Sequence, residues 1–192
     1  MIVAREKYNI LLGSASPRRR QLLEQMGVSF SLARIHYAEN HVPANLFREE
    51  IALHLAVEKS LAFGELKDFS LLITADTIVW HGDEVLGKPS GYADAVQMLT
   101  RLNNDWHEVI TGVCLRSNQK QVKFYDVSRV KFARLAPEEL KHYAEVYKPY
   151  DKAGAYGIQE WIGLIGIEAV EGSYFNVVGL PTRRLYEELS KF

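Results

Sequence analysis

The chain has 192 residues, of which 47% are hydrophobic and 24% are charged, so it is long enough to bury a substantial core. Its net charge of −1 supplies no general basic field for nucleic acid or an anionic membrane, so affinity for anions must come from a local site. The single cysteine, Cys114, excludes an internal disulfide, and no apolar run approaches the ~18 residues of a membrane span.

The N-terminus and the cysteine content indicate the compartment. MIVAREKYN carries charged residues inside what would be the apolar core of a signal peptide, which argues against secretion. A lone cysteine within the apolar alternation of HEVITGVCL is typical of a buried strand thiol and suits a reducing environment. We therefore expect a cytoplasmic protein without membrane association.

The first half of the chain predicts strands and helices in alternation. Residues 9–13 form a short apolar run typical of a buried strand. Ser16 and Pro17 suit the N-cap and the first position of a helix that follows it. Further helices are expected over about residues 48–63 and 92–102, on either side of the strong strand candidate LLITADTIVW.

The second half mixes strands with helices and one long loop. Three segments read as strands from apolar alternation or β-branched content: HEVITGVCLR, QVKFYDVSRVKFARL and WIGLIGIEAVEGS. Helices are expected to start at Pro137 and Pro181, and KPYDKAGAYGIQE, which has no period, reads as a loop. No repeat or long linker interrupts the order, which indicates one α/β domain over residues 1–192 with a mixed sheet and flanking helices.

Three consecutive arginines, Arg18 to Arg20, stand at the first turn of the first expected helix. Mutual repulsion and the helix dipole disfavour cations there, so they are either a solvated cluster or the ligands of an anion. A serine-rich turn before a helix supplies free backbone N–H groups, and arginine adds bidentate donors for phosphate oxygens. The Walker pattern GxxxxGK[ST] is missing, so this is not a P-loop. A phosphate explains three arginines in one turn better than solvent does.

Several other polar residues stand where chemistry is expected. Asp76 follows the apolar part of LLITADTIVW, at the expected carboxyl end of a buried strand, where α/β sheets place catalytic groups; the alternative is an aspartate that starts a turn. Asp83 reads as an ordinary hairpin-turn residue. Lys88 can reach a phosphate, although lysines in such loops are usually solvated. Lys152 and Gln159 lie in a loop of small residues, and a glutamine amide can pair with an imide edge.

Five motifs, in order along nearly the whole chain, resemble those of the Maf family: SASPRR, TADTIV with GKP, HEVITGV, DKAGAYGIQ and GSYFNVVGLP. The resemblance implies a fold akin to that of inosine triphosphatase, with a twisted sheet and two lobes around a cleft. It also implies cleavage of a nucleoside triphosphate between the α- and β-phosphates, with Mg²⁺ or Mn²⁺, to give a monophosphate and pyrophosphate. The role implied is the cleaning of nucleotide pools, with a link to cell division arrest.

The resemblance also implies roles for individual residues. The family's general base falls on Asp76, which is expected to hold the metal together with Glu39. Phosphate binding falls on one serine, two arginines and three lysines, namely Ser14, Arg18, Arg19, Lys59, Lys88 and Lys152. The subgroup similar to dTTP/UTP pyrophosphatases carries Arg, Thr and Gln at its specificity positions, which are here Arg18, Thr77 and Gln159. A uracil- or thymine-type base is therefore expected.

The chain departs from the family pattern at three positions. Ala38 stands in place of one carboxylate of the expected metal site, and Asp151 and Glu160 add negative charge beside the expected phosphate site. The alternative function is a non-catalytic regulator of septum formation that binds nucleotides or single-stranded nucleic acid. The net charge and the retained Asp76 favour the enzyme, with a nucleoside triphosphate as partner and no stable nucleic-acid binding. Such folds often form homodimers, and no sequence feature decides the oligomeric state.

Overall fold

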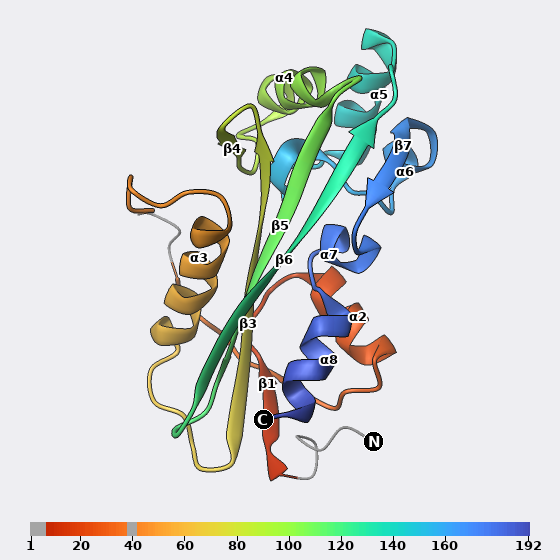
Figure 1. Ribbon diagram of the computed structural model, residues 1–192. Helices are drawn as coiled ribbons and strands as arrows, with labels where there is room; N and C mark the ends of the chain where they lie inside the picture. The colour runs from red at the N-terminus through yellow and green to blue at the C-terminus, as the bar shows by residue number, and fades with distance from the viewer. Residues whose placement is uncertain (1–6, 38–41) are drawn as a thin grey trace. The chain divides into compact units, whose positions relative to one another are not determined.

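A mixed seven-stranded sheet organises residues 7–37 and 42–192, the part of the chain that this computed structural model describes (Figure 1). Its strands are β1 (Asn9–Leu12), β2 (Ser31–Leu32), β3 (Ser70–His81), β4 (Glu84–Leu86), β5 (Trp106–Arg116), β6 (Gln121–Phe132) and β7 (Ile167–Glu171). The strand order is β2-β1-β3-β5-β6-β7, and β4 pairs with β3 beside this path. β1 runs parallel to β2 and β3, whereas the β3–β4 and β6–β7 pairs are antiparallel. The expected mixed α/β class is confirmed.

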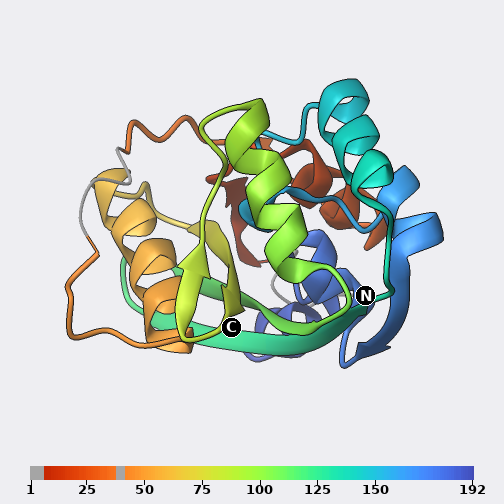
Figure 2. The ribbon, with the colours of Figure 1, turned by 90° about the horizontal axis from the view of Figure 1, so that it is seen from above.

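Helices flank this sheet (Figures 1 and 2). They are α2 (Pro17–Gln25), α3 (Glu49–Ala62), α4 (Tyr92–Leu102), α5 (Pro137–Tyr147), α6 (Trp161–Gly166), α7 (Tyr174–Val178) and α8 (Thr182–Ser190), with one 3₁₀ turn, η1 (Ala153–Ala155). The helices expected near residues 48–63, 92–102, 137 and 181 are all confirmed. In the ranges that the structure describes, no helix combines the length and the apolar character that a membrane crossing requires.

The chain forms two compact units. Unit 1 comprises Met1–Asp76, Thr111–Asp126 and Gly179–Phe192, and unit 2 comprises Thr77–Ile110 and Val127–Val178. The long strands β3, β5 and β6 therefore each contribute one part to either unit. Helices α2, α3 and α8 belong to unit 1, and α4 to α7 belong to unit 2, where α4 packs against α5 and η1. The single domain expected over residues 1–192 stays a prediction.

Local capping explains where two of the helices begin. The Ser16 hydroxyl accepts a hydrogen bond from the Arg19 N–H at 3.4 Å, and Pro17 occupies the first turn, as the sequence predicts. In α5 the Glu139 carboxylate accepts from the Ala136 N–H at 2.7 Å. Each bond satisfies a backbone donor that the helix itself leaves unpaired.

In unit 1, α3 lies directly against β3 and β5 (Figure 1). The Thr74 hydroxyl of β3 donates to the Ala56 carbonyl at 2.7 Å, and both residues are buried. On β5, a Cβ added to Gly112 would lie 2.4 Å from the carbonyl atoms of Ala52. This distance is shorter than real Cβ atoms show, so only glycine permits the helix and the strand to approach so closely here.

The strand β3 is longer than the sequence predicts. The expectation that the strand ends at Asp76 is wrong, because pairing continues to His81 and Asp76 lies in the interior of β3. The β-branched run after Asp76 sustains the strand, and its far end pairs with β4. The turn between them contains Gly82 (φ +57°) and Asp83 (φ +63°), so the interpretation of Asp83 as a hairpin-turn residue is confirmed.

The segment WIGLIGIEAVEGS is only partly a strand. Its first half forms α6, and β7 begins afterwards at Ile167. A Cβ on Gly163 would lie 1.9 Å from the Ile158 carbonyl oxygen, so this glycine allows the chain to coil back on itself. A helix of six residues is too short to show a helical period, so its apolar residues resemble a strand.

Candidate functional site

The turn between β1 and α2, in unit 1, carries the first expected phosphate-binding group. The Ser14 hydroxyl accepts hydrogen bonds from the Ser16 N–H and from Arg19 Nη1, each at 3.2 Å. Arg19 Nε donates to the Gly179 carbonyl at 2.8 Å, which ties the start of α2 to the residues before α8. The structure therefore brings Ser14 and Arg19 together, at a helix N-terminus that favours anions.

The three consecutive arginines point in different directions. Adjacent helical residues are separated by about 100°, so three in a row cannot converge on one anion. Arg20 is exposed and pairs with Glu24 at 2.9 Å on the outer face of α2, whereas Arg18 is half-buried. The structure thus separates a solvated Arg20 from the two arginines to which the sequence assigns phosphate binding.

Asp76 of β3 forms an ion pair with Lys59 of α3, through Oδ1 and Nζ. Asp76 is only 8% exposed, and the Lys59 ammonium also lies 5.8 Å from the ring centroid of Tyr37. Thr74 and Asp76, two residues apart, share the strand face that α3 covers, and their partners Ala56 and Lys59 are one helical turn apart. The expected general base and one of the expected phosphate-binding lysines are therefore in direct contact.

The expected metal site rests on few protein ligands. Glu39 lies outside the described residues, and within residues 7–37 and 42–192 no three His, Cys, Asp or Glu side chains gather as a metal-binding group. Mg²⁺ in nucleotide enzymes is usually held by one or two carboxylates together with substrate phosphates and water. The nearly buried Asp76 carboxylate fits this donor set.

The loop before α6, in unit 2, holds the second group of expected residues. Lys152 Nζ lies 2.6 Å from Asp151 Oδ1 and 3.0 Å from Glu160 Oε1, and its side chain is only 11% exposed. The two acidic departures from the family pattern are therefore the ion-pair partners of an expected phosphate-binding lysine. The negative charges of Asp151 and Glu160 are therefore partly compensated by the Lys152 ammonium.

The same loop lies against the segment that carries Lys88. The Gly154 N–H donates to the Gly87 carbonyl at 3.0 Å. Gly154 has φ +68°, and a Cβ there would lie 2.9 Å from Val79 Cγ2 of β3, so glycine is required on both counts. The GKP and DKAG motifs, more than sixty residues apart, are thus neighbours, and Lys88 itself is exposed.

The two remaining expected residues of unit 2 lie on different elements. Thr77 is half-buried on β3, next in the chain to Asp76. Gln159 is exposed and directly precedes Glu160, which occupies the N-cap position of α6. An exposed amide at this place is accessible to a ligand, which a base-reading role requires.

Sequence reasoning missed a residue that organises this loop. The Tyr143 hydroxyl of α5 accepts a hydrogen bond from the Gly157 N–H at 3.0 Å and donates to Glu160 Oε2. Tyr143 is completely buried, on the same helix face as Leu140 and Ala144, so its spacing is that of a core residue. Nothing in the helical pattern signals the partners of its hydroxyl group.

Two other motif residues meet in the core of unit 2. His107, from HEVITGV, bonds through Nε2 to the hydroxyl of Tyr156, from KAGAYG, at 2.7 Å, and Phe132 contacts both rings edge-on. Burial lowers the pKa of His107 to about 3 and raises the pKa of Tyr156. Both groups are therefore neutral near pH 7, which is typical of structural core residues.

The asparagine of GSYFNVVGLP is likewise structural. Asn176 Nδ2 donates to the Val109 carbonyl at 2.9 Å and to the Ser128 hydroxyl at 3.0 Å, so it fixes α7 to β5 and β6. The sequence assigns this residue no role, and these two hydrogen bonds explain why the motif carries a polar side chain at a buried position.

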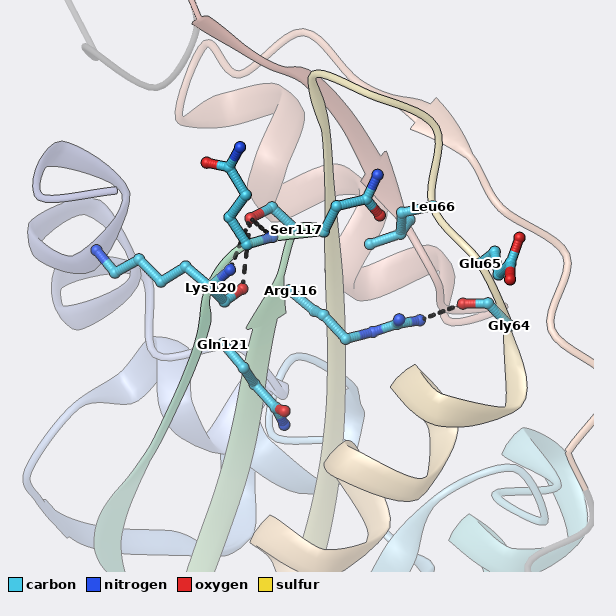
Figure 3. Close-up of a pocket in the computed structure, with 9 residues that line it drawn as sticks. Gly64, Glu65, Leu66, Arg116, Ser117, Lys120 and Gln121 are labelled. Atoms are coloured by element: carbon cyan, nitrogen blue, oxygen red, sulfur yellow. Dashed lines mark hydrogen bonds between the residues drawn. The ribbon is translucent and has the colours of Figure 1, made fainter.

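A hollow of about 600 Å³ in unit 1 has none of the expected site residues in its lining; Figure 3 shows the residues that line it. Its lining comes from the segment after α3 and from the β5–β6 turn with the adjoining strand ends: Gly64, Glu65, Leu66, Arg116, Ser117, Asn118, Gln119, Lys120 and Gln121. Arg116 donates to the Gly64 carbonyl at 2.9 Å and to the Ser60 hydroxyl at 2.9 Å. The guanidinium thus caps the carboxyl end of α3, and we assign no substrate to this hollow.

Comparison with known proteins places these residues in a family. The sequence profile of the Maf-like proteins matches residues 9–192. The chain is 50% identical over 187 residues to a dTTP/UTP pyrophosphatase of Phocaeicola vulgatus, with 97% of either chain covered. It is 46% identical over 192 residues to a dTTP/UTP pyrophosphatase of Bacteroides fragilis, with full coverage of both chains. A dTTP/UTP pyrophosphatase of Flavobacterium johnsoniae is 48% identical over 186 residues, which cover 96% of this chain and 95% of that protein.

Similarity of this extent, over all five motifs and both units, leads to one conclusion: the chain belongs to the Maf family.

Proposed function

We propose that this protein is a nucleoside triphosphate pyrophosphatase that converts dTTP and UTP to the monophosphate and pyrophosphate. The observation that carries the proposal is the match with full-length relatives named dTTP/UTP pyrophosphatase, which extends through the residues expected to act. The buried Asp76–Lys59 pair supports it, because a carboxylate held by a lysine inside a sheet is chemically suited to catalysis.

Asp76 acts as the general base in this proposal. Its carboxylate orients a water molecule and accepts a proton as the water attacks the α-phosphorus. Lys59 holds one carboxylate oxygen, so the other remains available for the water. A divalent cation bound by Asp76 and phosphate oxygens, Mg²⁺ or Mn²⁺, would supply positive charge to the leaving pyrophosphate.

The phosphates are bound by cationic side chains. A triphosphate carries about four negative charges near neutral pH, and burying them without compensation would be prohibitive. Arg18 and Arg19 at the start of α2, and Lys88 and Lys152 in unit 2, provide that compensation in the proposal. Ser14 keeps Arg19 oriented through its hydroxyl.

The base is recognised by donors and acceptors that match an imide. Uracil and thymine present a carbonyl, an N–H and a second carbonyl, to which the Gln159 amide is complementary. Thr77 and Arg18 complete the specificity set. Cytosine places an acceptor and an amine at these positions, so at least one polar group would be left unpaired.

Pyrophosphate release from a panel of canonical and modified nucleoside triphosphates tests the proposal. We expect UTP and dTTP to react at least about tenfold faster than CTP or 7-methyl-GTP. A profile led by a purine triphosphate contradicts the base assignment, and no release from any nucleotide contradicts the enzyme. In that last case, binding of single-stranded RNA would favour the regulator instead. We also propose the cytoplasm as the site of action and the cleaning of nucleotide pools as the role.

A further inference from the structure

The loop that carries Gln159 is attached to α5 by one buried hydroxyl group, that of Tyr143. Tyr143 is 0% exposed, and its oxygen accepts from the Gly157 N–H at 3.0 Å while its hydrogen goes to Glu160 Oε2. Gly157 and Glu160 stand on either side of Gln159 in the chain. One hydroxyl therefore bonds to the backbone on one side of the expected base-reading residue and to a side chain on the other.

Glu160 extends this connection to a second expected residue. Its other oxygen, Oε1, lies 3.0 Å from Lys152 Nζ. The Glu160 side chain does not cap α6, although its carbonyl accepts from the Gly163 N–H at 2.9 Å. The carboxylate instead bridges Tyr143 and Lys152, so the three side chains form one hydrogen-bonded series within unit 2.

Aromatic stacking strengthens the same attachment. The Tyr143 ring stacks on the Tyr147 ring at 5.0 Å, and Tyr147 stacks on Trp161 at 6.4 Å with an interplanar angle of 16°. Trp161 is the first residue of α6, directly after Glu160. The segment is thus attached to α5 by rings as well as by hydrogen bonds, which limits its rotation.

We propose that Tyr143 is a positioning residue for substrate recognition, which orients Gln159 toward the base and, through Glu160, holds Lys152 toward a phosphate. The inference rests on the proposed function. Lys152 has three N–H donors, of which two go to Asp151 and Glu160, and among the described residues it has no third partner. A lysine fixed in this way loses little further side-chain entropy when it binds phosphate.

The electrostatics of Tyr143 suit a permanent donor. Burial, together with the neighbouring Glu160, raises the pKa of Tyr143 well above its usual value. The hydroxyl consequently keeps its proton near neutral pH and stays a donor to Glu160 Oε2.

Steady-state kinetics of Tyr143→Phe with UTP and CTP tests the inference. The variant loses one charge-assisted bond and one backbone bond, so we expect KM for UTP to rise about tenfold or more. The UTP-to-CTP ratio of kcat/KM should fall severalfold, while kcat changes less than about twofold, because Asp76 and Lys59 are untouched. A mere loss of folded protein would lower the apparent kcat for both nucleotides and leave KM and the ratio unchanged.

Two further variants make the test decisive. Tyr147→Phe is the matched control, since it removes a hydroxyl one turn away on α5 and keeps the ring stack; it should behave as the wild type. Glu160→Gln keeps an acceptor for Tyr143 but removes the charge that holds Lys152, so KM should rise while the UTP-to-CTP ratio is retained. If Tyr143→Phe does not fold, an unchanged KM in Glu160→Gln overturns the inference.

The outcomes separate the inference from the function on which it rests. A folded Tyr143→Phe protein with wild-type KM and wild-type ratio overturns the positioning role and leaves the pyrophosphatase in place. A wild-type protein that releases no pyrophosphate contradicts the proposed function. The positioning role is then read from calorimetric binding of a non-hydrolysable UTP analogue, where equal affinities of the wild type and Tyr143→Phe overturn it.

Discussion

Acidification should destabilise this protein through His107. Its pKa is about 3 in the folded state and near 6.5 when unfolded, because burial among Phe132 and Tyr156 disfavours the charged ring. The charged form needs two acceptors, and within the described residues His107 Nδ1 has none. Between these two pKa values the unfolded state binds a proton that the folded state does not, so stability falls as the pH falls.

The magnitude follows from this difference in proton binding. The free energy of unfolding changes with pH by at most about 1.4 kcal/mol per pH unit for one proton. Lowering the pH from 7 to 5 should therefore reduce the free energy of unfolding by about 2 kcal/mol, and lowering it to pH 4 by about 3 kcal/mol. The contribution is fully present above pH 7 and is exhausted near pH 3, where the folded state also binds the proton. For a domain of ordinary stability this is a large fraction of the total.

Urea unfolding at several pH values measures the effect. His107→Gln is the comparison, because the amide can still bond to Tyr156 but does not titrate. Carboxylates contribute equally to the pH dependence of unfolding in both proteins. The difference between the two pH slopes of the free energy of unfolding is therefore the contribution of His107. If the wild type and the variant lose the same free energy of unfolding between pH 7 and 5, the burial argument for this histidine is wrong.

Three further predictions concern catalysis. Asp76→Asn should lower pyrophosphate release by about two decades or more while calorimetric binding of a non-hydrolysable analogue persists; a variant that keeps more than about a tenth of the rate would show that another group is the base. Arg18→Ala and Lys88→Ala should weaken catalysis with triphosphates, whereas Arg20→Ala should do little, since it pairs with solvent-exposed Glu24. Equal losses in all three would contradict the division of the arginine cluster. Gln159→Glu should abolish the preference for UTP over CTP, because the carboxylate lacks the amide donors; a retained preference would assign base reading to other residues.

The elements that the sequence predicted well are those with complete local signals. For α2, Ser16 and Pro17 mark the start, and for α4 the helical pattern over residues 92–102 coincides with the observed bounds. These signals act within one or two turns of chain, so they need no tertiary information. Arg19 lies in the first turn of α2, and the phosphate-binding roles expected of Ser14 and Arg19 stay predictions.

The misjudged elements depend on contacts distant in sequence. Asp76 was expected at a strand end, because nothing in LLITADTIVW reveals that β4 would extend the pairing. The contact of Asp76 with Lys59 arises only once α3 lies on β3. Tyr143 showed the spacing of a core residue, and the partners of its hydroxyl, Gly157 and Glu160, stand 14 and 17 residues later in the chain. The periodicity of a sequence indicates which face of a helix or strand is buried, but it does not indicate which hydrogen-bond partner a buried polar atom will have.

The contacts that attach α3 to the sheet also determine where the Lys59 ammonium lies. The helix is fixed to the sheet where Ala52 meets Gly112, where Ala56 accepts from Thr74, and where its last turn is capped by Arg116. Lys59 lies about 10 Å along the axis from Ala52, between Ala56 and the capped last turn, so the contacts that hold α3 on the sheet also hold the Lys59 ammonium. A side chain inserted at Gly112 would push α3 away from β5 at Ala52 and strain these contacts, so we expect it to shift the Lys59 ammonium relative to the Asp76 carboxylate of β3. Substitutions that disturb the packing of α3 on the sheet should therefore alter the Lys59–Asp76 ion pair before they unfold the core.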